Sequence, residues 1–193
     1  MQIFNIEMKA RVKSHKMPDG DNVVFWRWIT PNTIAIVTPT SVYHWSMDGG
    51  EEPTKQFDRH ASITGGQIIN YQASADGKWY VLVGISQGAG GTIVGNMQLY
   101  SVEKKISQPL KGHAGCFTNI KVDGIDRSVF CFVEMKPNEA GGMSNPRVRA
   151  LFFLSPSCFL IYSCTTAVCD GAWEGEGRAR WPVQVGSPGH SLR

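Results

Sequence analysis

Up to about residue 135 the chain is a succession of short runs in which hydrophobic and polar residues alternate, or β-branched and aromatic residues cluster. Both patterns are typical of β-strands, and no run shows the 3.6-residue period of a helix. The run VVFWRWI (23–29), for example, is followed by Pro31-Asn32 and then by TIAIVT (33–38). Because proline and asparagine favour tight turns, this segment predicts two strands joined by a turn.

Three segments resemble one another, each a short strand with a large ring in its middle and a polar exit. They are QIFNIE (2–7), VYHWSM (42–47) and MQLYSV (97–102), at spacings of 40 and 55 residues. Two strands joined by a tight turn precede the second and the third. Propeller blades repeat at roughly 40–50 residues with four antiparallel strands each, whereas a β-sandwich does not predict self-similar triplets. The period therefore predicts an all-β fold that is part of a β-propeller.

A fourth unit begins with FTNIKV (117–122) and SVFCFVEM (128–135) and lacks its third strand. After Met135 the pattern of hydrophobic and polar residues changes, and no segment continues the repeat of the blades. We therefore predict two regions, a partial propeller over 1–135 and an irregular tail over 136–193. We expect the tail to be disordered or to arise from a gene-model error, and its apolar stretch 151–168 to be marginal for a membrane span.

Composition narrows the classes of function. Lys+Arg 19 against Asp+Glu 16 gives a net charge of +3, too weak a field to indicate a nucleic-acid partner. The N-terminus has no apolar core of signal-peptide length, so we expect a cytoplasmic location. Five cysteines, an odd number, favour free thiols over a disulfide framework, and we expect Cys116 and Cys131 to be buried and inert because they lie in apolar runs.

The candidate catalytic and cofactor motifs lack the neighbouring residues and elements that such sites need. Ser86 lies in a G-x-S-x-G pattern, but glycines and then a strand follow it where a nucleophile elbow needs a helix. Partners in the right order are Asp123 or Asp126 with His190 in the doubtful tail. The GAGG segment at 88–91 lacks the Lys-Ser/Thr of a phosphate loop, and no cysteine or histidine spacing fits zinc. We predict no enzyme, no cofactor and no metal; a serine hydrolase using Ser86 is the remote alternative.

A run of segments in order carries a family resemblance over residues 1 to about 135. They include QIFNIEMKARVKSH, FWRWIT, VYHWSM, FDRHASI, QIINYQ and GNMQLYSVEKKISQPLKGHA. Together they resemble the N-terminal domain of clathrin heavy chains. The resemblance implies about three blades of a seven-bladed propeller, from the last strand of the second blade into the fifth, with an open edge at each end. A generic WD40-like interaction scaffold is the alternative, since Gly112-His113 resembles the start of a WD40 blade.

The resemblance implies three peptide-binding grooves. The clathrin-box groove corresponds to Gln2, Phe4, Lys9 and Arg11: Phe4 would contact apolar side chains, Gln2 the peptide backbone, and the two cations acidic residues. An ordinary strand with a solvated basic flank is the alternative, and the groove's other wall lies outside this sequence.

The second groove, which receives a tryptophan-containing motif, corresponds to Gln67 and Ile69, although QIINYQ also fits a plain core strand. We interpret Trp26 and Trp28 as blade packing. The third groove binds a leucine-rich arrestin loop, and we expect it to be the most complete of the three. Its positions are Trp79, Leu99, Lys104, Ile106 and Gln108.

The resemblance also implies partners and a location. We expect adaptor and arrestin-type proteins as partners, bound through short peptide motifs, with membranes reached only through adaptors and no nucleic acid. The intact parent would bind clathrin light chain and self-assemble as a trimer. Its place would be the cytoplasmic surface of coated pits and coated vesicles, at the plasma membrane and the trans-Golgi network.

Overall fold

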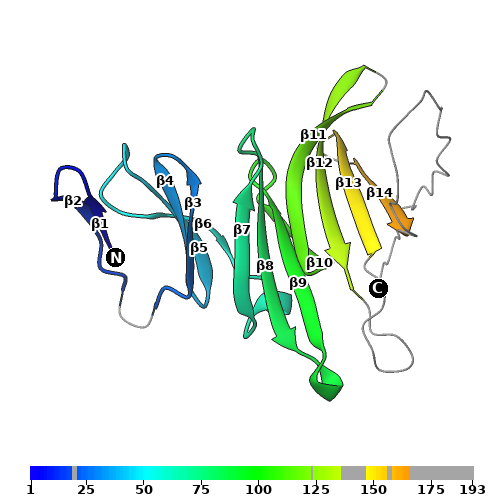
Figure 1. The fold of residues 1–193 in the computed structure, drawn as a ribbon, viewed down its shortest axis with the longest axis horizontal. Helices are drawn as coiled ribbons and strands as arrows, with labels where there is room; N and C mark the ends of the chain where they lie inside the picture. Colours follow the sequence, from blue (N-terminus) through cyan, green and yellow to red (C-terminus); the bar gives the residue numbers. More distant parts are fainter. Residues whose placement is uncertain (19–20, 123, 136–146, 156–157, 166–193) are drawn as a thin grey trace. The chain divides into compact units, whose positions relative to one another are not determined.

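The computed structural model describes residues 1–18, 21–122, 124–135, 147–155 and 158–165. The chain divides into two compact units, Met1–His113 and Ala114–Arg193. Within each sheet, strands that are consecutive in the sequence pair antiparallel with each other (Figure 1). The all-β fold and the repeated antiparallel sheets of a partial propeller are therefore confirmed.

The described residues of the first unit form one two-stranded sheet, two four-stranded sheets and two single-turn 3-10 helices. The two-stranded sheet consists of β1 (Gln2–Asn5) and β2 (Ala10–Ser14). The next consists of β3 (Phe25–Thr30), β4 (Thr33–Val37), β5 (Ser41–Ser46) and β6 (Thr54–Asp58). The third consists of β7 (Gln67–Ala73), β8 (Trp79–Gln87), β9 (Ile93–Ser101) and β10 (Ile106–Lys111), and the helices are η1 (Ala61–Ile63) and η2 (Ala89–Gly91).

Each full repeat has four strands rather than the three read from the sequence. The additional strands are β6 and β10, which the sequence suggested were polar connections. In β6 only Phe57 is buried, because an outermost strand has one neighbour and its side chains mostly face solvent. Hydrophobic alternation is therefore too weak there to mark a strand.

The described residues of the second unit form one four-stranded sheet of β11 (Ala114–Val122), β12 (Ile125–Glu134), β13 (Arg147–Ser155) and β14 (Cys158–Thr165). The expectations that this repeat lacks its third strand and that nothing after residue 135 continues the pattern are thereby corrected. The last two strands come from LFFLS and CFLIYSC, which are nearly continuous apolar runs, and such runs do not reveal a strand by alternation. The origin of residues 136–193 as coding sequence stays a prediction.

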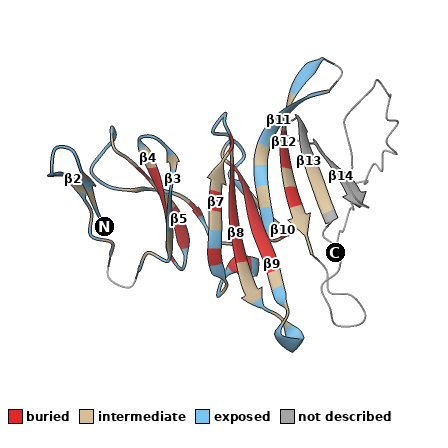
Figure 2. Ribbon diagram, in the orientation of Figure 1, coloured by how far each residue is buried: buried red, intermediate tan, exposed pale blue. Residues whose placement is uncertain are grey.

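The core of the first unit lies on both faces of β4 and β5, where Figure 2 shows a concentration of buried positions. On one face Val37 and Val42 pack in a cluster with Phe57 and with tyrosines of the β7–β10 sheet. The opposite face presents a second cluster, in which Met1 and Ile3 pack against three buried side chains. These are Ile34, Ile36 and Trp45.

The two tryptophans of β3 depart from the expectation of blade packing. Trp26 is 56% and Trp28 is 41% exposed. They lie directly opposite Ile36 and Ile34 and so share their face of the sheet. Those isoleucines of β4 are buried in the cluster that includes Ile3 of β1. β3 is the edge strand beside β4. Two strands, β1 and β2, therefore cover less of this face than a four-stranded sheet would.

Candidate functional site

The β1–β2 hairpin presents the residues of the first predicted groove. Gln2 and Phe4 point to the same, outer face of β1, and Phe4 is 57% exposed. Arg11 lies directly opposite Phe4 on β2, whereas Ile3 faces the core. An apolar ring is thus flanked by an amide and a guanidinium on one face of the two-stranded sheet, an arrangement suited to an extended acidic peptide.

The turn between β1 and β2 fixes the position of Lys9. The Asn5 side-chain oxygen accepts a hydrogen bond from the Met8 backbone N–H at 2.9 Å, and Lys9 follows with a left-handed φ of 50°. The turn between β9 and β10 repeats this geometry. There the Ser101 hydroxyl accepts from the Lys104 N–H at 3.4 Å, and the next residue, Lys105, has a φ of 54°. The two hairpins are therefore copies of one structural unit.

Glycine at position 105 is expected to stabilise the chain. A left-handed φ costs a residue with a Cβ roughly 1–2 kcal/mol, and glycine avoids this cost. We expect Lys105→Gly to raise the free energy of unfolding by roughly 0.5–1 kcal/mol and Lys105→Val to lower it by at least about as much. Urea denaturation measures both. Glu103→Gly, in the same turn at a residue without positive φ, is the matched control and should destabilise.

Lys13, which sequence reasoning did not single out, anchors the hairpin to the neighbouring sheet. Its ammonium group donates hydrogen bonds to the backbone oxygens of Ser46, Gly49 and Gly50 at 2.9, 3.0 and 3.1 Å. This contact uses the cation on the inner face of β2 and leaves Arg11 on the outer face. No sequence signal separates the two basic residues, because the partners of Lys13 are backbone atoms more than 30 residues away.

The second predicted site lies on β7, at its start. Ile69 occupies a bulge, since Ile68 pairs with Gly84 and the next paired residue is Asn70. The bulge turns Ile69 outward to 39% exposure, whereas Ile68 is 6% exposed. Gln67 lies at the wall of an open hollow of about 390 Å³. The hollow is lined by Gly65, Gln67, Ile85, Ser86, Gln87, Gly91 and Ile93.

The third predicted set lies on one face of the β7–β10 sheet. Trp79 and Ile106 both lie directly opposite Ser101, and Leu99 lies opposite Gln108. Ile106 is 60% exposed, but Leu99 has no exposed surface and so cannot contact a peptide directly. Lys104 is exposed in the turn beside them, and Trp79 and Gln108 are half-buried.

Ser86 is not at a nucleophile elbow. It lies within β8, paired with Val94, and the following helix η2 is three residues long and interrupted at Gly90. Of its proposed partners, Asp123 and His190 lie outside the described residues. Within the described part of the chain, no group of three metal-ligating side chains occurs, and no helix is long and apolar enough to cross a membrane.

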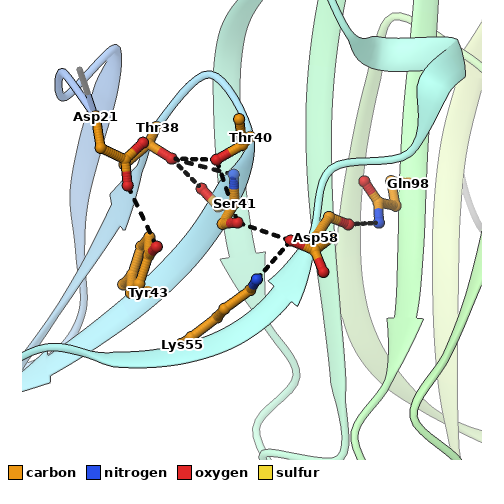
Figure 3. Close-up of polar contacts among 8 residues, drawn as sticks. All are labelled: Asp21, Thr38, Thr40, Ser41, Tyr43, Lys55, Asp58 and Gln98. Carbon is orange, nitrogen blue, oxygen red and sulfur yellow. Dashed lines mark hydrogen bonds and ion pairs between the residues drawn. The ribbon is translucent and has the colours of Figure 1, made fainter.

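A polar network, drawn in Figure 3, fixes the connection between the second and third sheets. The Ser41 hydroxyl donates to the Asp58 carboxylate at 2.8 Å, and Lys55 pairs with the same carboxylate at 2.7 Å. These two contacts, Lys55 first, lower the pKa of Asp58. The Asp58 backbone oxygen accepts a hydrogen bond from the Gln98 amide at 2.8 Å.

Arg59 continues the same connection. Its guanidinium donates to the backbone oxygens of Thr38 and Ile63 at 3.1 and 2.7 Å, and burial lowers its pKa. Gln98 thus ties the β7–β10 sheet, which carries the second and third candidate grooves, to β6, and Arg59 holds the connection that follows β6. The sequence did not indicate the role of Arg59 or of Gln98, because a polar residue within a strand or turn is ordinarily expected to lie at the surface.

Comparison with known proteins shows which proteins the chain is similar to. No family profile matches the chain. It is 54% identical over 134 residues to probable clathrin heavy chain 1 of Caenorhabditis elegans, which is 68% of this chain and 8% of the relative. It is 49% identical over 139 residues to clathrin heavy chain 2 of Homo sapiens, which is 71% of this chain and 8% of that relative. The Drosophila melanogaster clathrin heavy chain is 52% identical over 134 residues, again 68% of this chain and 8% of the relative. The chain thus spans about 8% of the length of these curated relatives.

Proposed function

Because the chain is homologous to clathrin heavy chains over about two thirds of its length, we propose that it is part of a coat component with a structural, non-catalytic role. Its partial propeller would bind short adaptor peptides during vesicle-mediated transport. The observation that carries the peptide-binding part is the outer face of β1–β2, where exposed Phe4 lies opposite Arg11 and beside Gln2.

The chemistry of this face fits an acidic, leucine-rich peptide. Phe4 offers an exposed apolar surface for a leucine side chain, and the Gln2 amide both donates and accepts hydrogen bonds with a peptide backbone. Lys9 and Arg11 supply positive charge at the hairpin end. A single such face in solvent gives a weak site, so multivalent display in a coat would supply the avidity.

The finer parts of the proposal concern partners and place. They are adaptor and arrestin-type proteins as ligands, and clathrin light chain binding and trimer formation by the longer parent. The location is the cytoplasmic surface of coated pits and vesicles at the plasma membrane and the trans-Golgi network. They rest on the homology, and for arrestin also on exposed Ile106 and Lys104 at the third groove.

Fluorescence anisotropy with two labelled peptides tests the assignment of the grooves. We expect Phe4→Ala to weaken binding of an acidic, leucine-rich clathrin-box peptide roughly tenfold, as for an exposed aromatic anchor. Ile106→Ala should weaken an arrestin-loop peptide instead. Each variant is the matched control for the other peptide. Binding of both peptides at wild-type strength to both variants would contradict the proposal.

A further inference from the structure

Two cysteines face each other in the second unit. Cys116 of β11 and Cys131 of β12 are directly opposite in the antiparallel register. Neither is in a disulfide, and Cys116 is exposed while Cys131 is half-buried. The expectation that both are buried, inert thiols is therefore wrong for Cys116. Alternate positions of β11 are exposed, and Cys116 is one of them although its neighbours in the sequence are apolar.

Their spacing suits a disulfide bond with a small adjustment. Directly opposite residues of an antiparallel pair have Cβ atoms about 4.5–5.5 Å apart and Cα atoms at most about 5.5 Å apart. Disulfides need Cα separations of about 4.4–6.8 Å and Cβ separations near 3.8 Å. The Cα spacing therefore fits, and the Cβ atoms must approach slightly. Burial raises the pKa of the Cys131 thiol, and the facing Cys116 raises it further, as neighbouring sulfurs would.

We propose that Cys116 and Cys131 form a reversible cross-strand disulfide when the chain meets a small-molecule disulfide such as oxidised glutathione. The exposed Cys116 thiolate attacks the small disulfide, forms a mixed disulfide and releases one small thiol. Cys131 then loses its proton and attacks the Cys116 sulfur, which releases the second small thiol. Two protein thiols are oxidised to one disulfide, and one small disulfide is reduced to two thiols.

The bond would be a labile one. A disulfide whose geometry is slightly strained has a more oxidising potential and is reduced more readily than a relaxed structural bond. Oxidation would fix β11 to β12 near the aromatic contact of Phe117 with Phe130, whose centroids are 5.0 Å apart. The site is thus suited to a reversible redox modification of this sheet.

The full chain, incubated with oxidised glutathione at neutral pH and then alkylated and digested with trypsin, tests this inference by mass spectrometry. We expect peptide 112–121 joined to the peptide that begins at Ser128, and its loss after excess reduced glutathione. The same joined peptide should form when Cys158, Cys164 and Cys169 are replaced by serine. Cys116→Ser, at an exposed position, should abolish it without loss of the circular-dichroism spectrum.

Two results would overturn the inference. One is complete alkylation of Cys116 and Cys131 in the wild-type chain after oxidation. The other is glutathione retained on Cys116 as a mixed disulfide, since Cys131 would then not resolve it. Both are observed on the wild-type protein, so they do not depend on the folding of a variant.

Discussion

Replacing Gln98 by leucine is expected to lower the free energy of unfolding by about 3 kcal/mol or more. Gln98 has no exposed surface, and its side chain makes three hydrogen bonds. The amide oxygen accepts from the His60 N–H at 2.7 Å, and the amide nitrogen donates to the Asp58 backbone oxygen and the Ser107 hydroxyl at 2.8 Å each. Leucine would fill the space but remove these three hydrogen bonds, each with a net contribution of about 0.5–1.5 kcal/mol, and leave partly buried partner groups unpaired.

Gln56→Leu is the matched control for this substitution. Gln56 also bonds a backbone oxygen, that of Thr54 at 3.1 Å, but in an exposed place where water can replace it. We expect a change below about 0.5 kcal/mol there. Urea denaturation followed by tryptophan fluorescence compares the two variants. Equal destabilisation would show that the Gln98 network does not hold the connection between the sheets.

The alternation of MQLYSV predicted the strand β9 correctly but not the role of Gln98. Met97, Gln98 and Leu99 are all buried, because this strand is covered on both faces. Polarity in such a strand does not indicate exposure. The groups that satisfy Gln98 include Asp58 and His60, 40 and 38 residues away in the sequence, and local pattern carries no information on contacts at that range.

In the β3–β6 and β7–β10 sheets, the sequence patterns predicted the first three strands and missed the fourth. β4, β5, β8 and β9 are buried along most of their length, so their hydrophobic runs are unmistakable. β6 and β10 have few buried positions, so their sequences resemble polar connections. For Trp26 the prediction failed in the opposite direction, because a tryptophan was expected to be buried and is exposed. Burial depends on which strands cover a side chain, and the residue type alone does not indicate that.

The first candidate groove depends on a register detail that no residue pattern predicts. Ile3 pairs with Lys13, and regular pairing would then place Val12 opposite Phe4. A register shift between Ile3 and Phe4 places Arg11 there instead. The family resemblance identified Phe4 and Arg11 as partners of one groove, and the bulge is the physical reason why they lie on the same face.

Acidification is expected to destabilise the first unit through His44. His44 lies half-buried between two sheets, with its Nε2 at 2.8 Å from the Tyr71 hydroxyl and its ring 4.7 Å from that of Tyr80. Burial lowers its pKa from 6.5 to about 4. The folded state therefore resists protonation, whereas the unfolded chain takes up a proton near pH 6.5. The contribution of His44 to stability is constant above that pH and falls as the pH drops toward 4, by about 2.5 kcal/mol at pH 4.5.

Urea denaturation at pH 7.5 and pH 4.5, on the wild type and on His44→Gln, isolates this contribution. Glutamine can still hydrogen-bond the Tyr71 hydroxyl but does not titrate, so the difference between the two pH values should shrink by about 2.5 kcal/mol in the variant. The pKa values of Asp58 and Asp76 are lowered, and stability from a carboxylate with a lowered pKa is lost mainly below pH 4. The chosen window therefore separates His44 from the carboxylates. An unchanged pH dependence in His44→Gln would contradict the prediction. It would mean that His44 is protonated in the folded protein with little loss of free energy of unfolding.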